Sequence, residues 1–279
     1  MRIGDLEYGN RIVVVGGGRL AQALGRTLGG RIVGYVRRTP SGADDHLVSE
    51  GRVVVSSISE ISDRFDTLWI ATADRAIADV AAELAGGRES WEGIVVIHSS
   101  GASPLSLLEP FRWKGGSIVA LHPNWGATGE EPIPADIYWG VSTADDRGAQ
   151  AASALLSLLG GRSISVDEAR RGVYHAAAST ASNFSVTLYV MALALYDAAG
   201  IDLDTAEEIA RRFMLDSIGR IVPGNPIGAL TGPIVRGDRD VVRRQLEGIR
   251  AHTPELWETF QALVRLTTSL VEAGGSRGV

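Results

Sequence analysis

Three polar side chains recur at intervals of four residues in an otherwise apolar stretch, at His175, Ser179 and Asn183. On a helix, each step of four residues turns the side chain by only about 40°, so the three would share one stripe. Because imidazole changes its charge near neutral pH, His175 could donate a proton to a carbonyl oxygen. Asn183 could hold that oxygen, and Ser179 could assist in positioning it. A seam of hydrogen bonds between packed helices is the alternative interpretation.

Polar clusters also follow several apolar runs that predict buried strands. The sequences are Thr72-Ala73-Asp74 after 66–71, His98-Ser99-Ser100-Gly101 after 93–97, and His122-Pro123-Asn124 after 117–121. In open parallel sheets, ligands bind beyond the carboxyl ends of the strands. We therefore expect substrate contacts from Ser100, Gly101, His122 and Asn124. A later turn, 231–238, adds Thr231 and Arg236, whose guanidinium could bind a carboxylate.

The stretch 11–24 predicts the element that would bind a cofactor. A β-branched run, 12–15, leads into Gly16-Gly17-Gly18-Arg19-Leu20-Ala21, and a helical run follows at once. A strand, a G-x-G-x-x-A turn and a helix in this order are typical of a dinucleotide site. Gly16 allows the tight turn, Gly18 lets the backbone approach a pyrophosphate, and Ala21 lets the helix pack closely. The anion would lie at the helix N-terminus, beside Arg19 and Leu20.

The end of the second predicted strand, 31–36, distinguishes two dinucleotides. NAD-binding folds place an acidic residue near this point, whereas this chain has Arg37-Arg38-Thr39. Guanidinium groups and a hydroxyl suit the 2′-phosphate of NADP, although a solvated basic loop would read the same way. We therefore expect NADP as the cofactor, with further contacts from the strand-end residues Ala71, Thr72, Ala73, Asp74 and Ser99.

Composition excludes several classes of function. The chain has 279 residues, 45% of them hydrophobic, a formal net charge of −6 and no cysteine. A negative net charge argues against a general nucleic-acid surface, and the absence of cysteine excludes thiolate chemistry. With no tight spacing of histidines and carboxylates either, we expect no metal site. Only one of the 27 basic residues, Lys114, is a lysine.

Strand and helix patterns alternate up to about residue 166, and helical patterns dominate beyond it. We expect an α/β fold: a doubly wound, parallel-sheet NADP-binding domain over 1–166, then an all-α domain over 167–279. The first long helix is apolar over most of its surface, which predicts a homodimer through these helices. The segment Tyr174–Tyr196 contains no Asp, Glu, Lys or Arg, but it carries His175 and several hydroxyl and amide side chains. We therefore expect it to be too polar to span a membrane. With no signal peptide recognised, we expect a cytoplasmic protein.

Seven segments carry a resemblance: GGGRLAQAL, YVRRTPSG, ATADRAIADVA, HSSGA, ALHPNWGA, YHAAASTASNF and ALTGPIVRGD. In this order and spacing they resemble a family of Rossmann-like oxidoreductases whose C-terminal helical domain is a domain of unknown function. The family is similar to the 6-phosphogluconate dehydrogenase-like superfamily, which includes ketopantoate, pyrroline-5-carboxylate and β-hydroxyacid reductases. The resemblance implies an NADP-binding domain, a helical dimerisation domain and a substrate cleft between them.

The chain departs from that superfamily at its catalytic helix. Many relatives carry Lys-x-x-x-Asn there, and in this chain Asn183 matches while Ser179 occupies the lysine position. We therefore expect His175 to act as the acid in an NADPH-dependent reductase of a small 2-oxo acid, with ketopantoate the best single substrate. An imine reductase, such as a pyrroline-5-carboxylate reductase, is one alternative. A non-catalytic NADP-binding sensor or scaffold, which the missing lysine favours, is the other.

Overall fold

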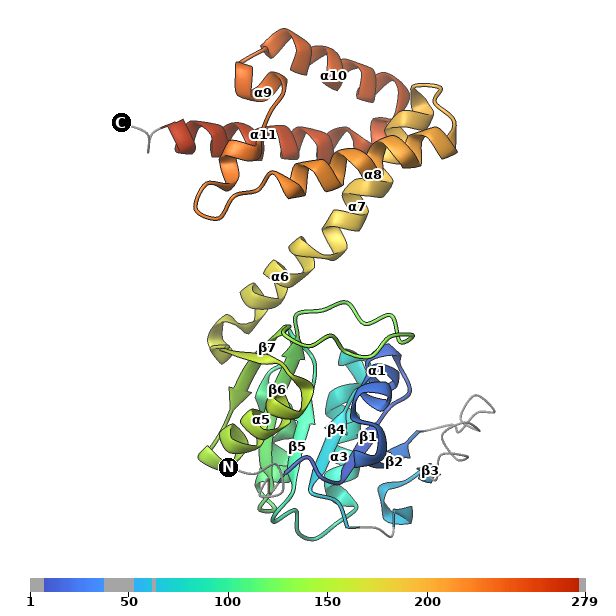
Figure 1. Cartoon of the computed structure of the whole chain (residues 1–279), viewed down its shortest axis with the longest axis vertical. Helices are drawn as coiled ribbons and strands as arrows, with labels where there is room; N and C mark the ends of the chain where they lie inside the picture. The colour runs from blue at the N-terminus through green and yellow to red at the C-terminus, as the bar shows by residue number, and fades with distance from the viewer. Residues whose placement is uncertain (1–7, 38–52, 62–63, 276–279) are drawn as a thin grey trace. The chain divides into compact units, whose positions relative to one another are not determined.

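The computed structural model describes residues 8–37, 53–61 and 64–275. The chain divides into two compact units, Met1–Ser179 and Thr180–Val279. The first unit holds the sheet and the second is helical, as Figure 1 shows by element. Each unit is described by itself below.

The first unit is built on one eight-stranded sheet in the order β3-β2-β1-β4-β5-β6-β7-β8. The strands are β1 (Ile12–Val15), β2 (Ile32–Val36), β3 (Val53–Val55), β4 (Thr67–Ile70), β5 (Val95–His98), β6 (Ser117–Pro123), β7 (Tyr138–Thr143) and β8 (Arg162–Ser165). Strands β1 to β6 pair in parallel, and the order reverses on either side of β1. The expected doubly wound sheet is confirmed.

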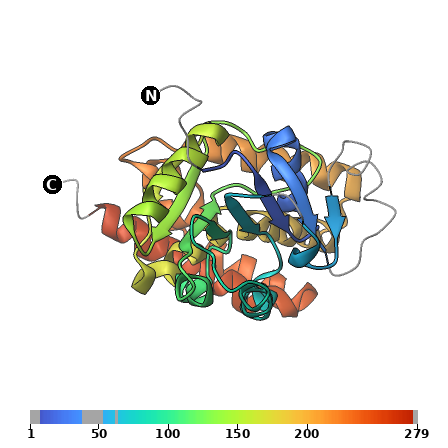
Figure 2. The ribbon, with the colours of Figure 1, turned by 90° about the horizontal axis from the view of Figure 1, so that it is seen from below.

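Two hydrophobic cores cover the two faces of this sheet, because side chains of successive strand residues point to opposite sides. Val14 packs with α1 and α5, whereas Val13 packs with α3 and Phe111 of α4. Figure 2 shows the same arrangement, with α1 and α5 on one side and α3 and α4 on the other. These helices are α1 (Arg19–Leu28), α3 (Ile77–Gly86), α4 (Glu109–Arg112) and α5 (Asp146–Leu159), with short 3-10 helices η2 (Gly29–Arg31), η4 (Ile58–Glu60), η5 (Asp74–Ala76), η6 (Leu105–Leu108) and η7 (Glu168–Arg170).

Strand β7 departs from the parallel pattern, because it runs antiparallel to β6. The connection between them, 124–137, contains no helix, so the chain turns back beside the strand it has just left. Strand β8 then pairs in parallel with β7 after the crossover through α5. The antiparallel return places Asn124 beside Tyr138, and the backbone N–H of Asn124 donates to the Tyr138 carbonyl at 2.9 Å.

Helix α6 (Arg171–Ala181) begins against the sheet through a buried arginine. The Arg171 side chain is 2% exposed, and its Nη2 lies 2.7 Å from Oε1 of Glu168. Its Nη1 donates to the carbonyl of Ser100 at 3.3 Å, and Nη2 also donates to the hydroxyl of Ser142. The remaining oxygen of Glu168 accepts the N–H of Leu105 at 2.7 Å. One guanidinium therefore joins α6 to the loop after β5 and to β7.

This anchor explains why the compact units divide within α6, beyond the boundary that the sequence analysis placed after residue 166. The first turns of α6 contact the sheet unit, and the unit ends at Ser179. Helix α6 itself ends at Ala181, and α7 (Asn183–Ala198) begins after Ser182, whose φ and ψ are −110° and −76°. The sequence analysis assumed one continuous helix from His175 to Asn183, and in the structure that helix is interrupted between α6 and α7.

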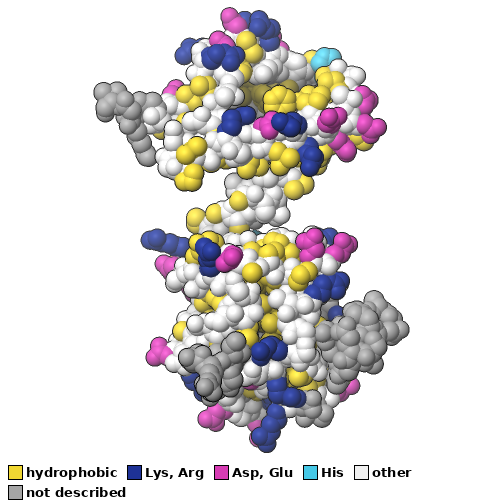
Figure 3. Space-filling model, in the orientation of Figure 1, with side chains coloured by type: hydrophobic (Ala, Val, Ile, Leu, Met, Phe, Trp, Pro, Cys, Tyr) yellow, Lys and Arg dark blue, Asp and Glu magenta, His cyan; other side chains and the backbone are white. Residues whose placement is uncertain are grey.

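The second unit contains the remaining helices, which pack as α7 on α8 and as α9, α10 and α11 on one another. They are α7, α8 (Leu203–Gly219), η8 (Pro226–Ala229), α9 (Pro233–Arg236), α10 (Arg239–His252), η9 (Pro254–Leu256) and α11 (Trp257–Gly275). Hydrophobic side chains are visible on the face of this unit in Figure 3. Among the described residues, one helical stretch, Glu168–Ala198, is long and apolar enough by length and composition to cross a membrane.

We predict that Arg171→Met destabilises the protein by about 3 kcal/mol, because it leaves the Glu168 carboxylate without its cation and the Ser100 carbonyl without a donor. The matched control is Arg170→Met, since that neighbouring side chain is 84% exposed and only pairs with Asp167 at 3.8 Å. Surface pairs of this kind contribute under about 1 kcal/mol. Urea unfolding of both variants measures the difference. Equal losses of stability would show that Arg171 is not an anchor.

Candidate functional site

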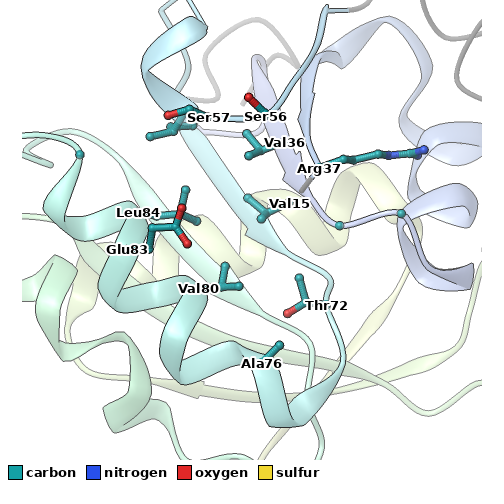
Figure 4. Close-up of a pocket in the computed structure, with 14 residues that line it drawn as sticks. Val15, Val36, Arg37, Ser56, Ser57, Thr72, Ala76, Val80, Glu83 and Leu84 are labelled. Carbon is teal, nitrogen blue, oxygen red and sulfur yellow. The ribbon is translucent and has the colours of Figure 1, made fainter. Parts of the chain in front are cut away.

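A cavity of about 550 Å³ opens at the carboxyl ends of β1, β2 and β3. Its walls come from the Gly-rich turn, the end of β2, the residues after β3 and β4, and helix α3, as Figure 4 shows. The lining residues are Val15, Gly16, Gly17, Val36, Arg37, Ser56, Ser57, Ile58, Thr72, Ala76, Val80, Glu83, Leu84 and Gly87. The cavity lies where the strand order reverses, which is the usual ligand position in doubly wound sheets.

The Gly-rich turn is shaped so that only glycine fits at its first position. Gly16 has a φ of +118°, and a Cβ there would lie 2.6 Å from the carbonyl oxygen of Ala71. Gly18 is the N-cap of α1 and, among the residues that the structure describes, no atom would meet a Cβ there within 4 Å and no side chain caps the helix. The first N–H groups of α1 are therefore available to an anion, as the sequence predicts. Ala21 is fully buried in the core against the sheet, which agrees with its predicted packing role.

Arg37 and Thr72 supply polar groups to the cavity. The Arg37 guanidinium lies 5.3 Å from the centre of the Tyr35 ring, and its burial lowers the pKa of Arg37 below the usual range while leaving it charged. The hydroxyl oxygen of Thr72 is buried and has no hydrogen-bond partner among the described residues. A buried hydroxyl without a partner in a cavity wall suits a ligand that supplies one. Arg38 and Thr39, which the sequence analysis also selected, lie outside the described residues.

The other predicted cofactor residues surround this region without lining the cavity. Arg19 is exposed at the start of α1, and Leu20 packs partly against the core. Ala73 is the N-cap of η5 and Asp74 is its first residue, and the Ser99 hydroxyl accepts the indole N–H of Trp69 at 2.7 Å. The sequence analysis did not select Ser56 and Ser57, although they follow β3 as the other polar clusters follow their strands. That strand-end signal could have found them.

A second polar cluster, the Tyr174 cluster, consists of His122, Asn124, Tyr174 and His175. The Tyr174 hydroxyl lies 2.9 Å from Nδ1 of His122 and accepts the amide of Asn124 at 2.8 Å. The rings of His122 and His175 lie 5.6 Å apart between centres and nearly perpendicular. The sequence analysis selected His122, Asn124 and His175 but not Tyr174, whose hydroxyl joins the first two.

Two glycines make room for the Tyr174 cluster. A Cβ at Gly101 would lie 2.4 Å from Cδ2 of His175 and 2.8 Å from Nε2 of His122. A Cβ at Gly140 would lie 2.4 Å from the hydroxyl oxygen of Tyr174. Gly101 was predicted to bind substrate, and in the structure its backbone lies directly against both imidazole rings. Gly140 carries no such signal in the sequence.

Burial keeps His122 neutral at neutral pH. The pKa of His122 is lowered to about 4, first by its burial and then by the nearby His175 and Arg171. The pKa of Tyr174 is raised by burial, which outweighs the opposing hydrogen bond from Asn124 and the charge of Arg171. The cluster therefore presents a neutral imidazole beside a protonated phenol at neutral pH.

Other predicted substrate residues have local structural partners. The Ser100 hydroxyl accepts the N–H groups of Ala102 and Ser103, at 3.2 and 2.9 Å, which fixes the loop after β5. In the second unit, Arg236 pairs with Asp238 at 2.9 Å and lines a separate cavity of about 610 Å³ between α9, α10 and α11. Thr231 lies exposed just before α9.

The predicted catalytic stripe is divided between the units. His175 and Ser179 are in α6 of the first unit, and Asn183 is the first residue of α7 in the second. Their catalytic roles, and the substrate roles of Thr231 and Arg236, stay predictions. Lys114 is accounted for locally, since its ammonium donates to the carbonyls of Ala85 and Arg88 at 2.8 and 2.9 Å. Among the described residues, no group of three or more acidic, histidine or cysteine side chains could hold a metal ion.

We predict an acid-sensitive stability that depends on His98. This residue is fully buried at the end of β5, neither ring nitrogen has a hydrogen-bond partner among the described residues, and burial lowers its pKa from 6.5 to about 4. The unfolded chain binds a proton near pH 6.5 and the folded chain only near pH 4, so stability falls as the pH drops through this window, by about 3 kcal/mol.

Urea unfolding at pH 7.5 and 4.5 tests this dependence. His98→Leu should reduce the pH dependence, while the control His252→Leu, at an exposed histidine in α10, should leave it unchanged. Retention of the full pH dependence in His98→Leu would contradict the assignment to His98. Because burial also lowers the pKa of His122, part of the dependence should persist in every variant that keeps His122.

Comparison with known proteins agrees with this architecture. Residues 8–123 match the family model of a Rossmann-like domain, and residues 137–267 match that of a domain of unknown function, DUF2520. No curated protein sequence matches the chain.

Solved structures share the fold at low sequence identity. A protein of Bacteroides fragilis is 22% identical with a TM-score of 0.76, and the match covers 95% of this chain and 100% of that one. A pyrroline carboxylate reductase of Plasmodium falciparum, solved with NADP bound, is 12% identical with a TM-score of 0.61, covering 96% and 99% of the two chains. A reductive aminase of Aspergillus terreus, solved with NADPH, is 17% identical with a TM-score of 0.68, covering 96% and 94%. The chain thus combines a Rossmann-like domain with a DUF2520 domain.

Proposed function

We propose that the protein is an NADP(H)-dependent oxidoreductase that reduces a small carbonyl compound. The observation that carries this proposal is the 550 Å³ cavity over Gly16 and Gly17, with Arg37 and the unpartnered Thr72 hydroxyl in its walls. Its size and its position at the open N-terminus of α1 fit a dinucleotide. The similar structures from Plasmodium falciparum and Aspergillus terreus, solved with NADP and NADPH, support the same cofactor.

The residues of this chain would divide the binding of NADP(H) among them. The N–H groups at the start of α1 would hold the pyrophosphate, since no side chain in the described part of the chain caps them. Arg37 would bind the 2′-phosphate, together with Arg38 and Thr39 as the sequence predicts. The nucleotide would supply a hydrogen-bond partner for the Thr72 hydroxyl. When bound, the cofactor supplies a hydride, and the chain must supply the proton.

The Tyr174 cluster is the proposed source of that proton. It contains an amide, neutral imidazole and phenol, with the cation of Arg171 close enough to affect the pKa of both His122 and Tyr174. Such surroundings favour an oxygen that gains negative charge during reduction over a positively charged iminium. We therefore keep a 2-oxo acid, with ketopantoate the best single guess, as the proposed substrate. Ser100, Gly101 and Asn124 are the proposed neighbours of the carbonyl, and the role of Arg236 as the carboxylate ligand stays a prediction from the sequence.

Reduction of a carbon–nitrogen double bond is the second candidate. It is favoured by the names of similar solved structures, which include pyrroline-5-carboxylate reductases and imine reductases. A non-catalytic NADP-binding sensor is favoured only by the serine at position 179. Oxidation of NADPH in the presence of ketopantoate, pyruvate or pyrroline-5-carboxylate distinguishes the three. Turnover of the oxo acids supports our proposal, turnover of the imine alone supports the second, and binding without turnover supports the sensor.

We predict that NADPH binds at least 10-fold more tightly than NADH. Arg37→Gln should weaken NADPH binding about 10-fold, the loss of one charge-assisted hydrogen bond, and should change NADH binding less than about 2-fold. The control Arg112→Gln alters an exposed arginine paired with Glu109 and should change neither. Titration of protein fluorescence measures the dissociation constants. Equal constants for the two nucleotides in the wild-type protein would contradict the 2′-phosphate assignment.

We also propose that a second copy of the chain covers α7. Phe184, Val186 and Val190 are 55%, 63% and 57% exposed on this helix, although they are large and apolar. Ser182, Asn183, Ser185 and Thr187 lie among them, which suits another protein surface better than lipid. The proposed form of the protein is a cytoplasmic homodimer in which the apolar faces of two α7 helices would cover each other.

We predict that the wild-type protein sediments as a dimer at micromolar concentration. Val186→Glu should shift it toward the monomer, because it would bury a charge in the proposed interface. The control Trp113→Glu removes a comparably exposed apolar residue, 78% exposed, from the sheet unit and should leave the dimer intact. A wild-type monomer, or equal dissociation in both variants, would refute the α7 interface.

A further inference from the structure

The Tyr174 hydroxyl is the point at which polar groups from two separate elements converge. It projects from α6, while His122 belongs to β6 and Asn124 follows that strand. The three groups are within hydrogen-bond distance, at 2.9 Å to His122 and 2.8 Å to Asn124. No motif in the sequence pairs a tyrosine with these residues, which lie 52 and 50 positions away.

The available hydrogens restrict how these bonds can be arranged. The Asn124 amide nitrogen can only donate, so it takes one lone pair of the phenol oxygen. A neutral imidazole carries one proton, on Nδ1 or on Nε2. With the proton on Nε2, the phenol donates to Nδ1. With the proton on Nδ1, the imidazole donates to the phenol, and the phenol hydrogen is directed elsewhere.

The second arrangement prepares a proton for transfer. Both lone pairs of the phenol oxygen then accept hydrogen bonds, from Asn124 and His122, which stabilises the negative charge left after the proton departs. Arg171 contributes in the same direction, because its charge favours the ionised phenol. A tautomer change in His122 therefore switches Tyr174 between a held and a transferable proton.

We propose that Tyr174 is the catalytic proton donor and that His122 reprotonates it. This rests on the proposed function. As the substrate carbon accepts hydride, the phenol O–H bond breaks and an O–H bond forms on the substrate oxygen. The phenolate then takes the Nδ1 proton of His122, while Nε2 takes one proton from water on the side of His175. The net change is one proton from solvent for each carbonyl reduced, and His122 returns from the Nε2–H to the Nδ1–H tautomer by proton exchange with water before the next turnover.

This assignment gives His175 a different role from the one that the sequence predicts. Its ring lies beside that of His122, 5.6 Å away between centres, and no hydrogen bond joins it to Tyr174 among the described contacts. His175 therefore lies on the route by which protons reach His122, and it acts on the substrate only through His122 and Tyr174. Asn124 is a positioning residue, since it orients the phenol without exchanging a proton.

The first test is spectroscopic and uses the protein without cofactor. In ¹⁵N NMR of labelled histidine, Tyr174→Phe should shift the Nδ1 resonance of His122, because it removes that nitrogen's partner. Tyr138→Phe, which removes the hydroxyl of a 48% exposed tyrosine, should leave it unchanged. An unchanged His122 resonance in Tyr174→Phe would overturn the proposed pair.

The second test follows NADPH oxidation with ketopantoate or pyruvate. Tyr174→Phe should lower kcat by about 10²–10⁴, the usual contribution of a general acid, with NADPH binding unchanged. Gly140→Ala should act in the same direction, because its Cβ would lie 2.4 Å from the hydroxyl oxygen of Tyr174. The matched control is Gly172→Ala, in α6 itself, where a Cβ meets no atom within 4 Å. Its kcat should stay within about 2-fold.

The outcomes separate this inference from the proposed function. If the wild-type protein reduces an oxo acid and Tyr174→Phe does so at the same rate, Tyr174 is not the donor, while the oxidoreductase proposal stands. If the wild-type protein binds NADPH but reduces none of these compounds, both proposals fail. Loss of turnover in Tyr174→Phe and Gly140→Ala, with the control Gly172→Ala active, supports both the proposed function and the role of Tyr174.

Discussion

The candidate site depends on one buried cation. Arg171 joins the start of α6 to the loop after β5 and to β7, and Glu168 balances its charge while capping the N-terminal N–H of η6. A buried guanidinium is tolerated only when its donors are satisfied, so its partners must hold their positions. Tyr174 and His175 follow within one turn of α6. Their placement against β6 and the β5 loop is therefore a consequence of where Arg171 is held.

The sheet edge and the Gly-rich turn could be predicted because their signals are local. Gly16 is required by the φ of a single residue, and the strand-end position of His122 follows from a short apolar run. Arg37 likewise follows β2 directly. Such features depend on a few consecutive residues, and a strand order that reverses beside β1 then gathers them at one edge.

The rest of the site could not be predicted because it depends on contacts between distant segments. Tyr174 acquires its role only through residues about fifty positions away, and Gly140 matters only because the Tyr174 ring packs against it. The stripe from His175 to Asn183 assumed an uninterrupted helix, and the break after Ala181 could not be inferred from a run of alanine, serine and threonine. Arg171 resembles its exposed neighbour Arg170 in sequence, and only tertiary packing distinguishes them.

Two proposals belong together: NADP(H) binds at the edge of the sheet, and the Tyr174 cluster reacts with the substrate beside it. A crystal structure of the protein with NADP⁺ tests both in one measurement. We expect the adenosine half in the cavity of Gly16, Arg37 and Thr72, and the nicotinamide ring beside the Tyr174 hydroxyl. A nucleotide bound elsewhere, or a nicotinamide ring directed away from Tyr174 and His122, would contradict this expectation.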